Sequence, residues 1–298
     1  MPNLTLGPKV RKPLHLHDKK LKHLEEKAFA IREDIVKMLV EAGSGHSAGP
    51  LGMADIFTAL YFHVMVHDPK RSNWKDRDRL ILSNGHICPV RYATMAHAGY
   101  FPKAWLKTLR KFGSPLQGHP EREKLSEAET TSGPLGSGSS QAVGMAYAGL
   151  LDRAPWRVYC VMSDGELECG QTWEAMLFAG RNKLYNCTFI IDRNNIQIDG
   201  QTEEVMPLEP LQEKFEAFNL NVIRCAGNSI RDFVNAIEQA HGMSEKATVI
   251  IADTVPGYGV DFMEHNFLWH GKPPTFKEGK EALEWLRTLG GKIKSEHE

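Results

Sequence analysis

Five short runs of apolar residues, separated by segments of helical character, constrain the fold of this chain more than any other feature. The runs favour β-strands and show no alternation of polar and apolar residues. They are RLILS (79–83), RVYCVM (157–162), CTFIID (187–192), NVIRC (221–225) and TVIIADT (248–254). Strands that are apolar on both sides are typical of a parallel sheet covered by helices on both faces. We therefore predict an α/β fold with that architecture.

Helical periodicity fills the stretches around these runs. From about 18 to 42, apolar residues recur at steps of three and four, and Gly43 follows as a stop signal. Further helices are predicted at about 51–66, 88–98, 103–112, 139–152, 171–184, 208–218, 229–243 and 279–290. No Pro/Ser/Gly-rich linker and no internal repeat interrupts this pattern. We expect one domain over 18–290, an extended N-terminal arm over 1–17 and a polar tail over 291–298.

Charge and cysteine content exclude several classes of protein. Among 298 residues there are 36 Lys and Arg and 37 Asp and Glu, so the chain has no electrostatic footprint for nucleic acid. The sequence contains no run of roughly 18 apolar residues, the length needed to span a membrane. The polar, basic N-terminus also lacks the apolar core of a signal peptide. Five cysteines without a CxxC pair argue against a disulfide framework and a structural zinc site. A cytoplasmic protein is the expectation.

Polar side chains stand where two of the predicted strands end. The second run leads into SDGELECG, in which Asp164 is followed at once by Gly165. Asp followed by Gly is most often a turn. In parallel sheets, however, ligands bind beyond the carboxyl ends of the strands, and the third run brings Asp192, Asn194 and Asn195 to the same edge. Carboxylate and amide oxygens are hard ligands of the kind that Mg²⁺ or Ca²⁺ prefers.

A glycine-dense segment just upstream, TSGPLGSGSSQAVGMA (131–146), continues into a predicted helix. Backbone N–H groups at a turn into a helix N-terminus suit a phosphate group. One carboxylate with neutral oxygens leaves a divalent ion net positive, so the ion could bridge to a diphosphate. Each feature alone is a common turn or loop. Together, at one edge of the sheet, they predict a site for a divalent metal and a diphosphate.

The combination resembles the thiamine-diphosphate fingerprint, a GDG-type turn followed at a set spacing by an Asn pair; here Asp164 precedes Asn194 by 30 positions. Four further stretches resemble transketolases, in the family's order. They are SGHSAGPLG (44–52), LSNGHICPVRYA (82–93), QGHPE (117–121) with TTSGPLGSG (130–138), and MEHNFLWHGKPP (263–274). The resemblance runs from about 20 to 290 and covers only the first third to half of a full transketolase. It implies the N-terminal subunit of a split transketolase with the family's diphosphate-binding fold.

This resemblance implies a role for each residue of the predicted metal and cofactor site. Asp164, Asn194 and the backbone carbonyl of Ile196 would hold Mg²⁺, for which Ca²⁺ could substitute. Ile196 would also press against the thiazolium ring. The residues expected to contact thiamine diphosphate are His86, Gly133, Pro134, Leu135, Asp164, Gly165, Asn194, Ile196 and His270. A glycine at 133 lets the backbone approach the cofactor closely.

Four of the thirteen histidines fall in the family's motifs. By resemblance, His46 and His270 bind the hydroxyl groups of the sugar and move protons, and His119 contacts the C1 hydroxyl of the donor. His86 contacts the diphosphate. Imidazole suits proton transfer because its ordinary pKa lies near neutrality. The remaining histidines, among them His97, His241 and His265, are expected to be ordinary surface or core residues.

The chain departs from the family pattern at three places. Ser163 stands where a glycine usually precedes Asp164, and GPLGSGS replaces GPLGQG. The family's interface glutamate is Cys169 here, and a thiol cannot share a proton as a carboxylate does. Because successive positions of a chain point in different directions, the neighbouring Glu168 is not expected to substitute. These departures leave the identity of the sugars open.

The resemblance also implies a partner and a reaction. We expect a C-terminal transketolase subunit that carries the pyrimidine-binding domain, in a heterotetramer with two copies of each chain. The pair would transfer a two-carbon ketol unit from a ketose phosphate to an aldose phosphate. Two alternatives stay open: a decarboxylating ketol or acyl transfer resembling that of deoxyxylulose-phosphate synthase, and a non-catalytic regulatory half.

Overall fold

The centre of the protein is a sheet of five strands that all run parallel, in the order β1-β2-β3-β7-β6. The structure is a computed structural model that describes residue 11 and residues 13–288. The strands are β1 (Arg79–Leu82), β2 (Val158–Ser163), β3 (Cys187–Arg193), β6 (Asn221–Ala226) and β7 (Thr248–Asp253). All five predicted strands and their parallel arrangement are thus confirmed.

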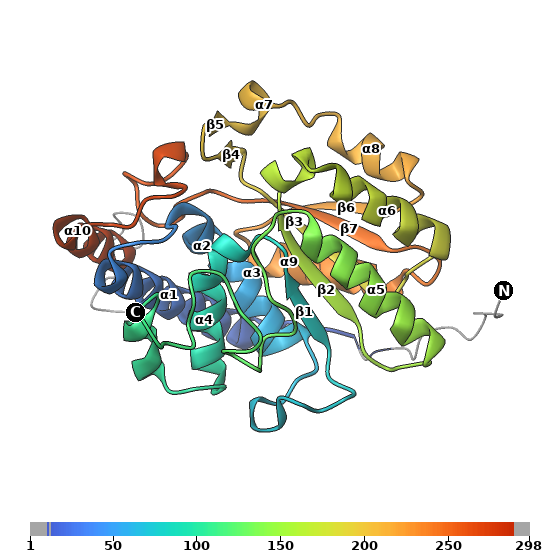
Figure 1. The fold of residues 1–298 in the computed structure, drawn as a ribbon, viewed down its shortest axis with the longest axis horizontal. Coiled ribbons are helices and arrows are strands. Elements are labelled where there is room, and N and C mark those ends of the chain that lie inside the picture. Colours follow the sequence, from blue (N-terminus) through green and yellow to red (C-terminus); the bar gives the residue numbers. More distant parts are fainter. Residues whose placement is uncertain (1–10, 12, 289–298) are drawn as a thin grey trace.

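Helices cover both faces of the sheet (Figure 1). One layer contains α1 (Asp18–Ala42), α3 (Ala54–Ala59), α4 (Cys88–Ala98) and α9 (Ile230–Gly242), with α10 (Phe276–Arg287) packed on α1. The other layer contains α5 (Ser137–Leu151), α6 (Gly170–Asn182) and α8 (Leu211–Ala217). Apart from α3, these helices correspond to predicted ones, with ends that differ by at most three residues.

The strands are apolar throughout because alternate side chains enter two different cores. Along β2, Tyr159 and Val161 pack with α1, α3 and α4, whereas Val158, Cys160 and Met162 pack with α5 and α6. Successive side chains of a strand point to opposite faces. Each strand therefore needs apolar residues at both odd and even positions.

Two predicted helices are wrong. The stretch 51–66 is divided into α2 (Ala48–Gly52), α3 and a π-helical turn (Leu60–Val64). The break falls at Gly52, whose carbonyl accepts a hydrogen bond from Asn228 Nδ2 at 2.8 Å. The stretch 103–112 holds only a 3₁₀ turn (Lys103–Thr108), because Arg110 is left-handed (φ 61°) and its N–H donates to Leu116 O at 2.9 Å.

Between β3 and α8 the chain forms elements that were not predicted. A two-stranded hairpin, β4 (Ile196–Gln197) with β5 (Gly200–Gln201), leads into the short helix α7 (Thr202–Val205). These elements are too short to show a period in the sequence. They matter because they carry the residues that follow Asn194 over the edge of the sheet (Figure 1).

Near the N-terminus, Arg11 binds both carboxylate oxygens of Asp78, which directly precedes β1. This contact lies at the amino edge of the sheet, opposite the predicted site. Residues 1–10 and 12 of the predicted arm and the predicted tail (291–298) lie outside the described residues, whereas 13–17 are described and form neither helix nor strand. Within the part of the chain that is described, none of the helices has the length and apolar character needed to cross a membrane.

Candidate active site

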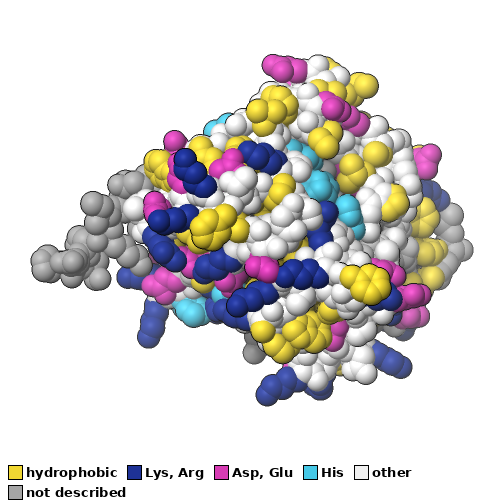
Figure 2. Space-filling model, turned by 60° about the vertical axis from the view of Figure 1, so that its left-hand side comes forward, with side chains coloured by type: hydrophobic (Ala, Val, Ile, Leu, Met, Phe, Trp, Pro, Cys, Tyr) yellow, Lys and Arg dark blue, Asp and Glu magenta, His cyan; other side chains and the backbone are white. Residues whose placement is uncertain are grey.

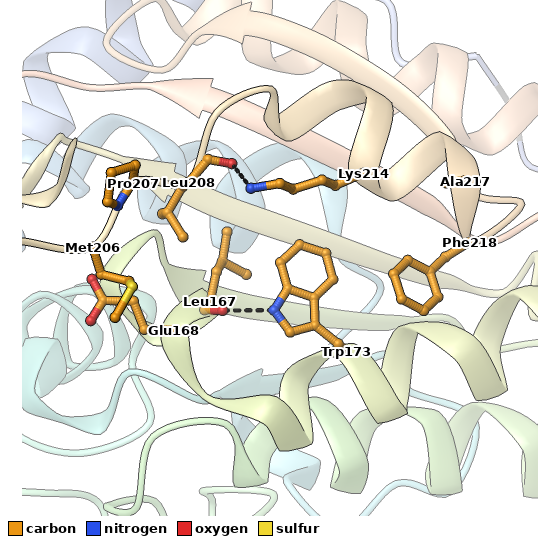
Figure 3. A pocket seen from close by; sticks show the side chains of 9 residues that line it. All are labelled: Leu167, Glu168, Trp173, Met206, Pro207, Leu208, Lys214, Ala217 and Phe218. Atoms are coloured by element: carbon orange, nitrogen blue, oxygen red, sulfur yellow. Dashed lines mark hydrogen bonds between the residues drawn. The ribbon is translucent and has the colours of Figure 1, made fainter.

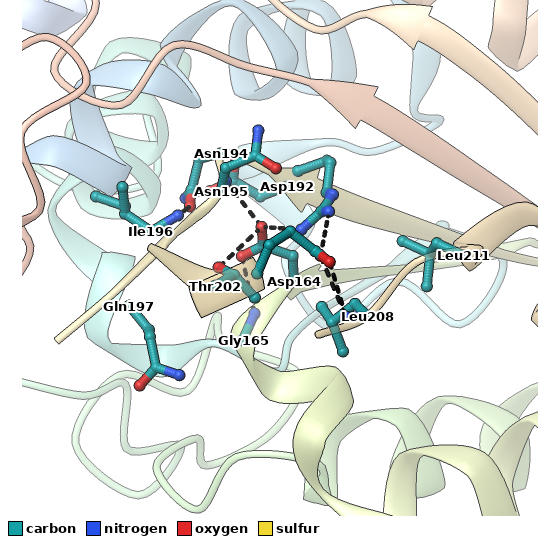
Figure 4. A network of polar contacts seen from close by, with 12 residues as sticks. Asp164, Gly165, Asp192, Asn194, Asn195, Ile196, Gln197, Thr202, Leu208 and Leu211 are labelled. Atoms are coloured by element: carbon teal, nitrogen blue, oxygen red, sulfur yellow. Dashed lines mark hydrogen bonds and ion pairs between the residues drawn. The ribbon is translucent and has the colours of Figure 1, made fainter. Parts of the chain in front are cut away.

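Asp164 follows β2 at the carboxyl edge of the sheet and is completely buried. Its backbone N–H donates to Asp192 O at 3.1 Å, which fastens the turn to β3. Its Oδ1 accepts a hydrogen bond from Gly165 N at 2.8 Å, and its Oδ2 accepts one from Asn195 N at 2.8 Å (Figure 4). Burial raises the pKa of Asp164 to about 6, although Arg193 and the Asn195 N–H favour the charged form.

The end of β3 supplies the amide group beside Asp164. Asn194 donates from Nδ2 to Asp192 Oδ2 at 2.9 Å, and its Oδ1 accepts from Ile196 N at 3.0 Å. These two bonds determine which way the amide points. Asp192 is fully buried and also accepts from Thr254 Oγ1; burial raises the pKa of Asp192 to about 7. The structure therefore places Asp164 and Asn194 at the same edge of the sheet.

Two charged residues of this edge were not singled out from the sequence. Arg193, the last residue of β3, forms ion pairs with Asp164, Glu203 and Glu209. Glu166 is fully buried and accepts hydrogen bonds from Ser83 Oγ and from Gly136 N at 2.6 Å. Both residues stand within the motifs themselves, Glu166 two positions after Asp164 and Arg193 directly before Asn194, and this placement was the available signal.

Glu166 joins the end of β2 to the glycine-rich segment at the start of α5. Besides Ser83 and Gly136, it accepts a hydrogen bond from Ser163 N at 3.3 Å. Gly136 has a left-handed backbone (φ 84°). Burial raises the pKa of Glu166, and the three donors oppose that shift. The carboxylate thus holds the glycine-rich turn beside the Asp164 turn, as a phosphate site in this place requires.

The four motif histidines come from separate parts of the chain and meet beside this edge. The ring centroids of His46 and His86 are 4.9 Å apart, those of His86 and His270 are 5.1 Å apart, and those of His46 and His270 are 5.6 Å apart. His119 lies near Gly85, at 3.1 Å from where a Cβ of that glycine would stand. On the face in Figure 2, histidine side chains gather near the centre beside hydrophobic ones.

Desolvation keeps these imidazoles neutral. Burial lowers the pKa of His46 to about 4, with help from His270, Arg110 and His119. Burial also lowers the pKa of His86 far below its ordinary value, and lowers the pKa values of His119 and His270. The Nδ1 atom of His46 is buried without a hydrogen-bond partner among the described residues. A neutral ring with a free nitrogen can accept a proton from a bound hydroxyl group.

Close contacts join the histidines to the glycine-rich segment and to the hairpin that follows Asn194. A Cβ at Gly85 would lie 3.2 Å from Gly133 N, and a Cβ at Gly271 would lie 3.6 Å from Ile198 Cδ1 and 3.9 Å from His46 Nε2. At the outer side of His119, a cavity of about 450 Å³ is lined mainly by polar groups, including Arg110, Gln117 and Ser132. The site is therefore continuous from the β2 and β3 ends to the 110–132 segment.

The other residues predicted to line the cofactor lie around this site. Pro134 and Leu135 are exposed, and a Cβ at Gly133 would meet open space. The side chain of Ile196 is buried in the core, 2% exposed. Among the histidines left out of the site, His97 pairs with Asp34 and His241 with the hydroxyl group of Tyr159. The specific role of each site residue stays a prediction.

A second cavity, of about 430 Å³, lies between α6 and α8 next to Glu168 (Figure 3). Its lining is mostly apolar, with Leu167, Trp173 and Phe218 among the residues. The Trp173 indole donates to Leu167 O at 2.7 Å, and Lys214 Nζ donates to Leu208 O at 2.5 Å. Because the polar groups of the indole and the lysine already have partners within the wall, this cavity does not extend the reactive site.

The donor set at the sheet edge fits a magnesium ion that is shared with a phosphate. Within 11 and 13–288, no three His, Cys, Asp or Glu side chains gather as a metal site of their own. Asp164 Oδ1 and Asn194 Oδ1 each accept one protein hydrogen bond, from Gly165 N and Ile196 N, so each oxygen keeps a lone pair. One carboxylate and neutral oxygens, completed by phosphate oxygens, are the ligands that Mg²⁺ commonly takes.

A test of the histidine environment follows from these pKa values. Since folding lowers the pKa of His46 from 6.5 to about 4, the unfolded chain takes up this proton first as the pH falls below 6.5. The stability associated with His46 is thus present above pH 6.5 and decreases as the pH falls toward 4. Between pH 7 and pH 5, the free energy of unfolding of wild type is therefore expected to fall by about 2 kcal/mol more than that of His46→Gln.

Urea unfolding at the two pH values measures this difference. His23→Gln, on the exposed side of α1, is the control and is expected to follow wild type. Equal pH dependence of His46→Gln and wild type would show that His46 is solvated as in the unfolded chain.

A parallel α/β sheet with a glycine-rich turn and an Asp–Asn motif at its carboxyl edge defines the class of thiamine-diphosphate-binding domains. Comparison with known proteins identifies the family within this class. Residues 24–288 match the transketolase thiamine diphosphate binding domain. This chain belongs to the transketolase family.

Several relatives match nearly the whole chain. The 6-deoxy-6-sulfo-D-fructose transketolase subunit SqwG of Clostridium sp. (strain MSTE9) is 38% identical over 90% of this chain and 97% of its own length. An apulose-4-phosphate transketolase subunit of Actinobacillus succinogenes is 40% identical over 89% of this chain and 96% of its own length. Both relatives are named as subunits of transketolases.

Solved transketolases share the fold. The enzyme of Leishmania mexicana superposes with a TM-score of 0.84 and is 31% identical, over 94% of this chain and 42% of the other. The Campylobacter jejuni enzyme has a TM-score of 0.83 and is 33% identical, over 91% and 43%. This chain thus spans about two fifths of the solved transketolases, the part that contains the cofactor domain. The predicted fold class and family are confirmed.

Proposed function

We propose that this chain is the N-terminal subunit of a split transketolase that uses thiamine diphosphate and Mg²⁺. It transfers a two-carbon ketol unit from a ketose to an aldose, together with a C-terminal subunit that carries the pyrimidine-binding domain. The assembly is a cytoplasmic heterotetramer with two copies of each chain. The observation that carries this proposal is the cluster of His46, His86 and His270 beside the Asp164 turn, with centroids 4.9 to 5.6 Å apart.

In this proposal the edge of the sheet holds the cofactor and its metal. Mg²⁺, or Ca²⁺ in its place, would be held by Oδ1 of Asp164, Oδ1 of Asn194 and the carbonyl of Ile196. The diphosphate would be contacted by His86, Gly165 and Asn194. The rest of the cofactor would be lined by Gly133, Pro134, Leu135, Ile196 and His270. When bound, thiamine diphosphate supplies the electron sink for breaking and making a carbon–carbon bond.

The histidines act on the sugar. His46 and His270 are neutral at pH 7 because burial lowers their pKa values, so each can accept a proton from a sugar hydroxyl and return it later. His119, at the mouth of the polar cavity, binds the C1 hydroxyl of the donor. The half-buried position of all four rings limits the access of water to the reacting atoms.

The sugars are inferred only as a class. Two relatives are named for substrates with an anionic group, a sulfo sugar and a sugar phosphate, and we infer a ketose phosphate or sulfonate here. Cys169 lies close to the glycine-rich turn, its Cβ at 3.0 Å from where a Cβ of Gly136 would stand. Glu168 accepts a hydrogen bond from Gln197 Nε2 at 2.8 Å, and we infer that it does not replace the family's glutamate.

A coupled ketol-transfer assay tests the proposal. The chain is co-expressed with a candidate C-terminal transketolase subunit and supplied with Mg²⁺, thiamine diphosphate, xylulose 5-phosphate and ribose 5-phosphate. Turnover that needs both chains is the expected result. Full activity of the isolated chain would contradict the split enzyme. Cofactor binding without turnover would direct the search to other sugars and to Cys169→Glu.

The same preparation separates the alternatives. Turnover of pyruvate or hydroxypyruvate with release of CO₂ would favour decarboxylating transfer. A complex that binds no thiamine diphosphate would favour a regulatory half.

A further inference from the structure

We propose that Arg193 is a positioning residue that orients Asp164, so that one carboxylate oxygen faces the metal ion. This inference rests on the proposed cofactor site. Arg193 ends β3, immediately before Asn194, and its side chain is 2% exposed. A long cationic side chain is almost never buried unless it is paired, and here its ion-pair partners are Asp164, Glu203 and Glu209.

The two oxygens of Asp164 are used differently. Oδ2 accepts from Arg193 Nη1 at 3.0 Å and from Asn195 N at 2.8 Å, with Thr202 Oγ1 at 3.4 Å. Among the described residues, Oδ1 accepts only from Gly165 N, at 2.8 Å. Three donors thus saturate Oδ2 and leave Oδ1 as the oxygen that can bind a cation. Figure 4 shows these bonds converging on the carboxylate.

Arg193 is itself held from its other side. Its Nη2 donates to Glu203 Oε1 at 2.6 Å and to Glu209 Oε1 at 3.0 Å. Glu203 in turn accepts from Leu208 N at 3.1 Å, and Glu209 accepts from Leu211 N at 2.7 Å. These bonds fix the orientation of the guanidinium group. Through it, the carboxylate of Asp164 is linked to the segment from α7 to the start of α8.

The charges around Arg193 show that it is no substitute for the metal. One guanidinium faces three carboxylates, those of Asp164, Glu203 and Glu209, so the group keeps a net charge of about −2 when all are ionised. Such a group attracts a divalent cation rather than repelling it. A guanidinium also donates to carboxylates on both sides at once, in a planar fork that an ammonium group cannot reproduce.

Binding of metal and cofactor, rather than turnover, tests the role. Thiamine diphosphate is titrated into the full-length chain in complex with its C-terminal partner, at a series of Mg²⁺ concentrations, and quenching of tryptophan fluorescence is recorded. Arg193→Met is expected to raise the apparent Kd for Mg²⁺ roughly tenfold or more, the range for a lost outer partner of a metal ligand. Arg193→Lys should restore part of the affinity.

Two further variants keep the test independent of general stability. Arg11→Met removes the arginine partner of Asp78 at the amino edge of the sheet, and is expected to leave the Kd for Mg²⁺ unchanged. The double variant Glu203→Gln, Glu209→Gln removes surface carboxylates only, which are 37% and 43% exposed. It should weaken Mg²⁺ binding severalfold, because Arg193 loses its fixed direction, even if Arg193→Met does not fold.

The outcomes separate this inference from the proposed function. Unchanged or tighter Mg²⁺ binding in Arg193→Met, or in the double variant if the first does not fold, overturns the positioning role while wild type still binds its cofactor. A wild-type complex that binds no thiamine diphosphate at any Mg²⁺ concentration overturns the proposed function and this inference with it.

Discussion

Asp164→Asn is expected to reduce ketol transfer by the two-chain complex roughly 10³-fold, the effect of losing several kcal/mol of metal-assisted stabilisation. Asparagine keeps the shape of the side chain but not its charge. Its amide NH₂ must also face a donor, because Gly165 N lies against Oδ1 while Arg193 and Asn195 N lie against Oδ2. Both the metal and the turn are therefore affected. Steady-state rates over a range of Mg²⁺ concentrations measure the effect.

The control makes the same chemical change at an exposed position. Asp152→Asn lies at the end of α5, away from the site, and should leave the rates unchanged. If Asp164→Asn kept near-normal rates and Mg²⁺ dependence, the metal would have to bind elsewhere in the complex.

Gly180→Ala is expected to destabilise the chain by about 3 kcal/mol or more, as overpacking against rigid backbone does at its upper range. A Cβ at Gly180, on α6, would lie 1.9 Å from the carbonyl oxygen of Phe218. Neither partner can move cheaply, because α6 and the end of α8 pack on the same core. Thermal or urea unfolding measures the loss.

Gly144→Ala, in the interior of α5, is the matched substitution, and it is expected to change the stability in the opposite direction. A Cβ there would meet no atom within 4 Å, so only the helix propensity changes. Alanine is favoured over glycine in a helix by about 0.5 to 1 kcal/mol, and the variant should be stabilised by that amount. If both variants behaved alike, the close contact between α6 and Phe218 would be wrong.

Much of the fold was readable from local patterns. All five strands were predicted from short apolar runs, and helix α4 agreed at both ends. These patterns are reliable because each residue's burial depends on the face that its own element presents to a core. The prediction failed at 51–66, where Gly52 O bonds to the distant Asn228, and at 103–112, where Arg110 is left-handed and its N–H bonds to Leu116 O in the following turn.

The site was predictable to the extent that its residues stand at strand ends. The positions of Asp164 and Asn194 after β2 and β3 implied a shared edge, since parallel strands end on the same side. The sequence did not indicate that Arg193 would turn inward to Asp164, or that Glu166 would bind Ser83 and Gly136. Each of these contacts depends on a partner that a different element supplies.

By itself, then, the sequence determined the parallel α/β architecture, the Asp–Asn motif and the family to which the chain belongs. Only the tertiary structure decided which side chains meet: His46, His86 and His270 come from segments up to 224 positions apart, yet their rings lie within 5.6 Å. The spacing of apolar residues along the sequence indicates only which face of a single helix or strand is buried. The meeting of distant side chains, and the loss of water that shifts their pKa values, arise only when the layers pack together.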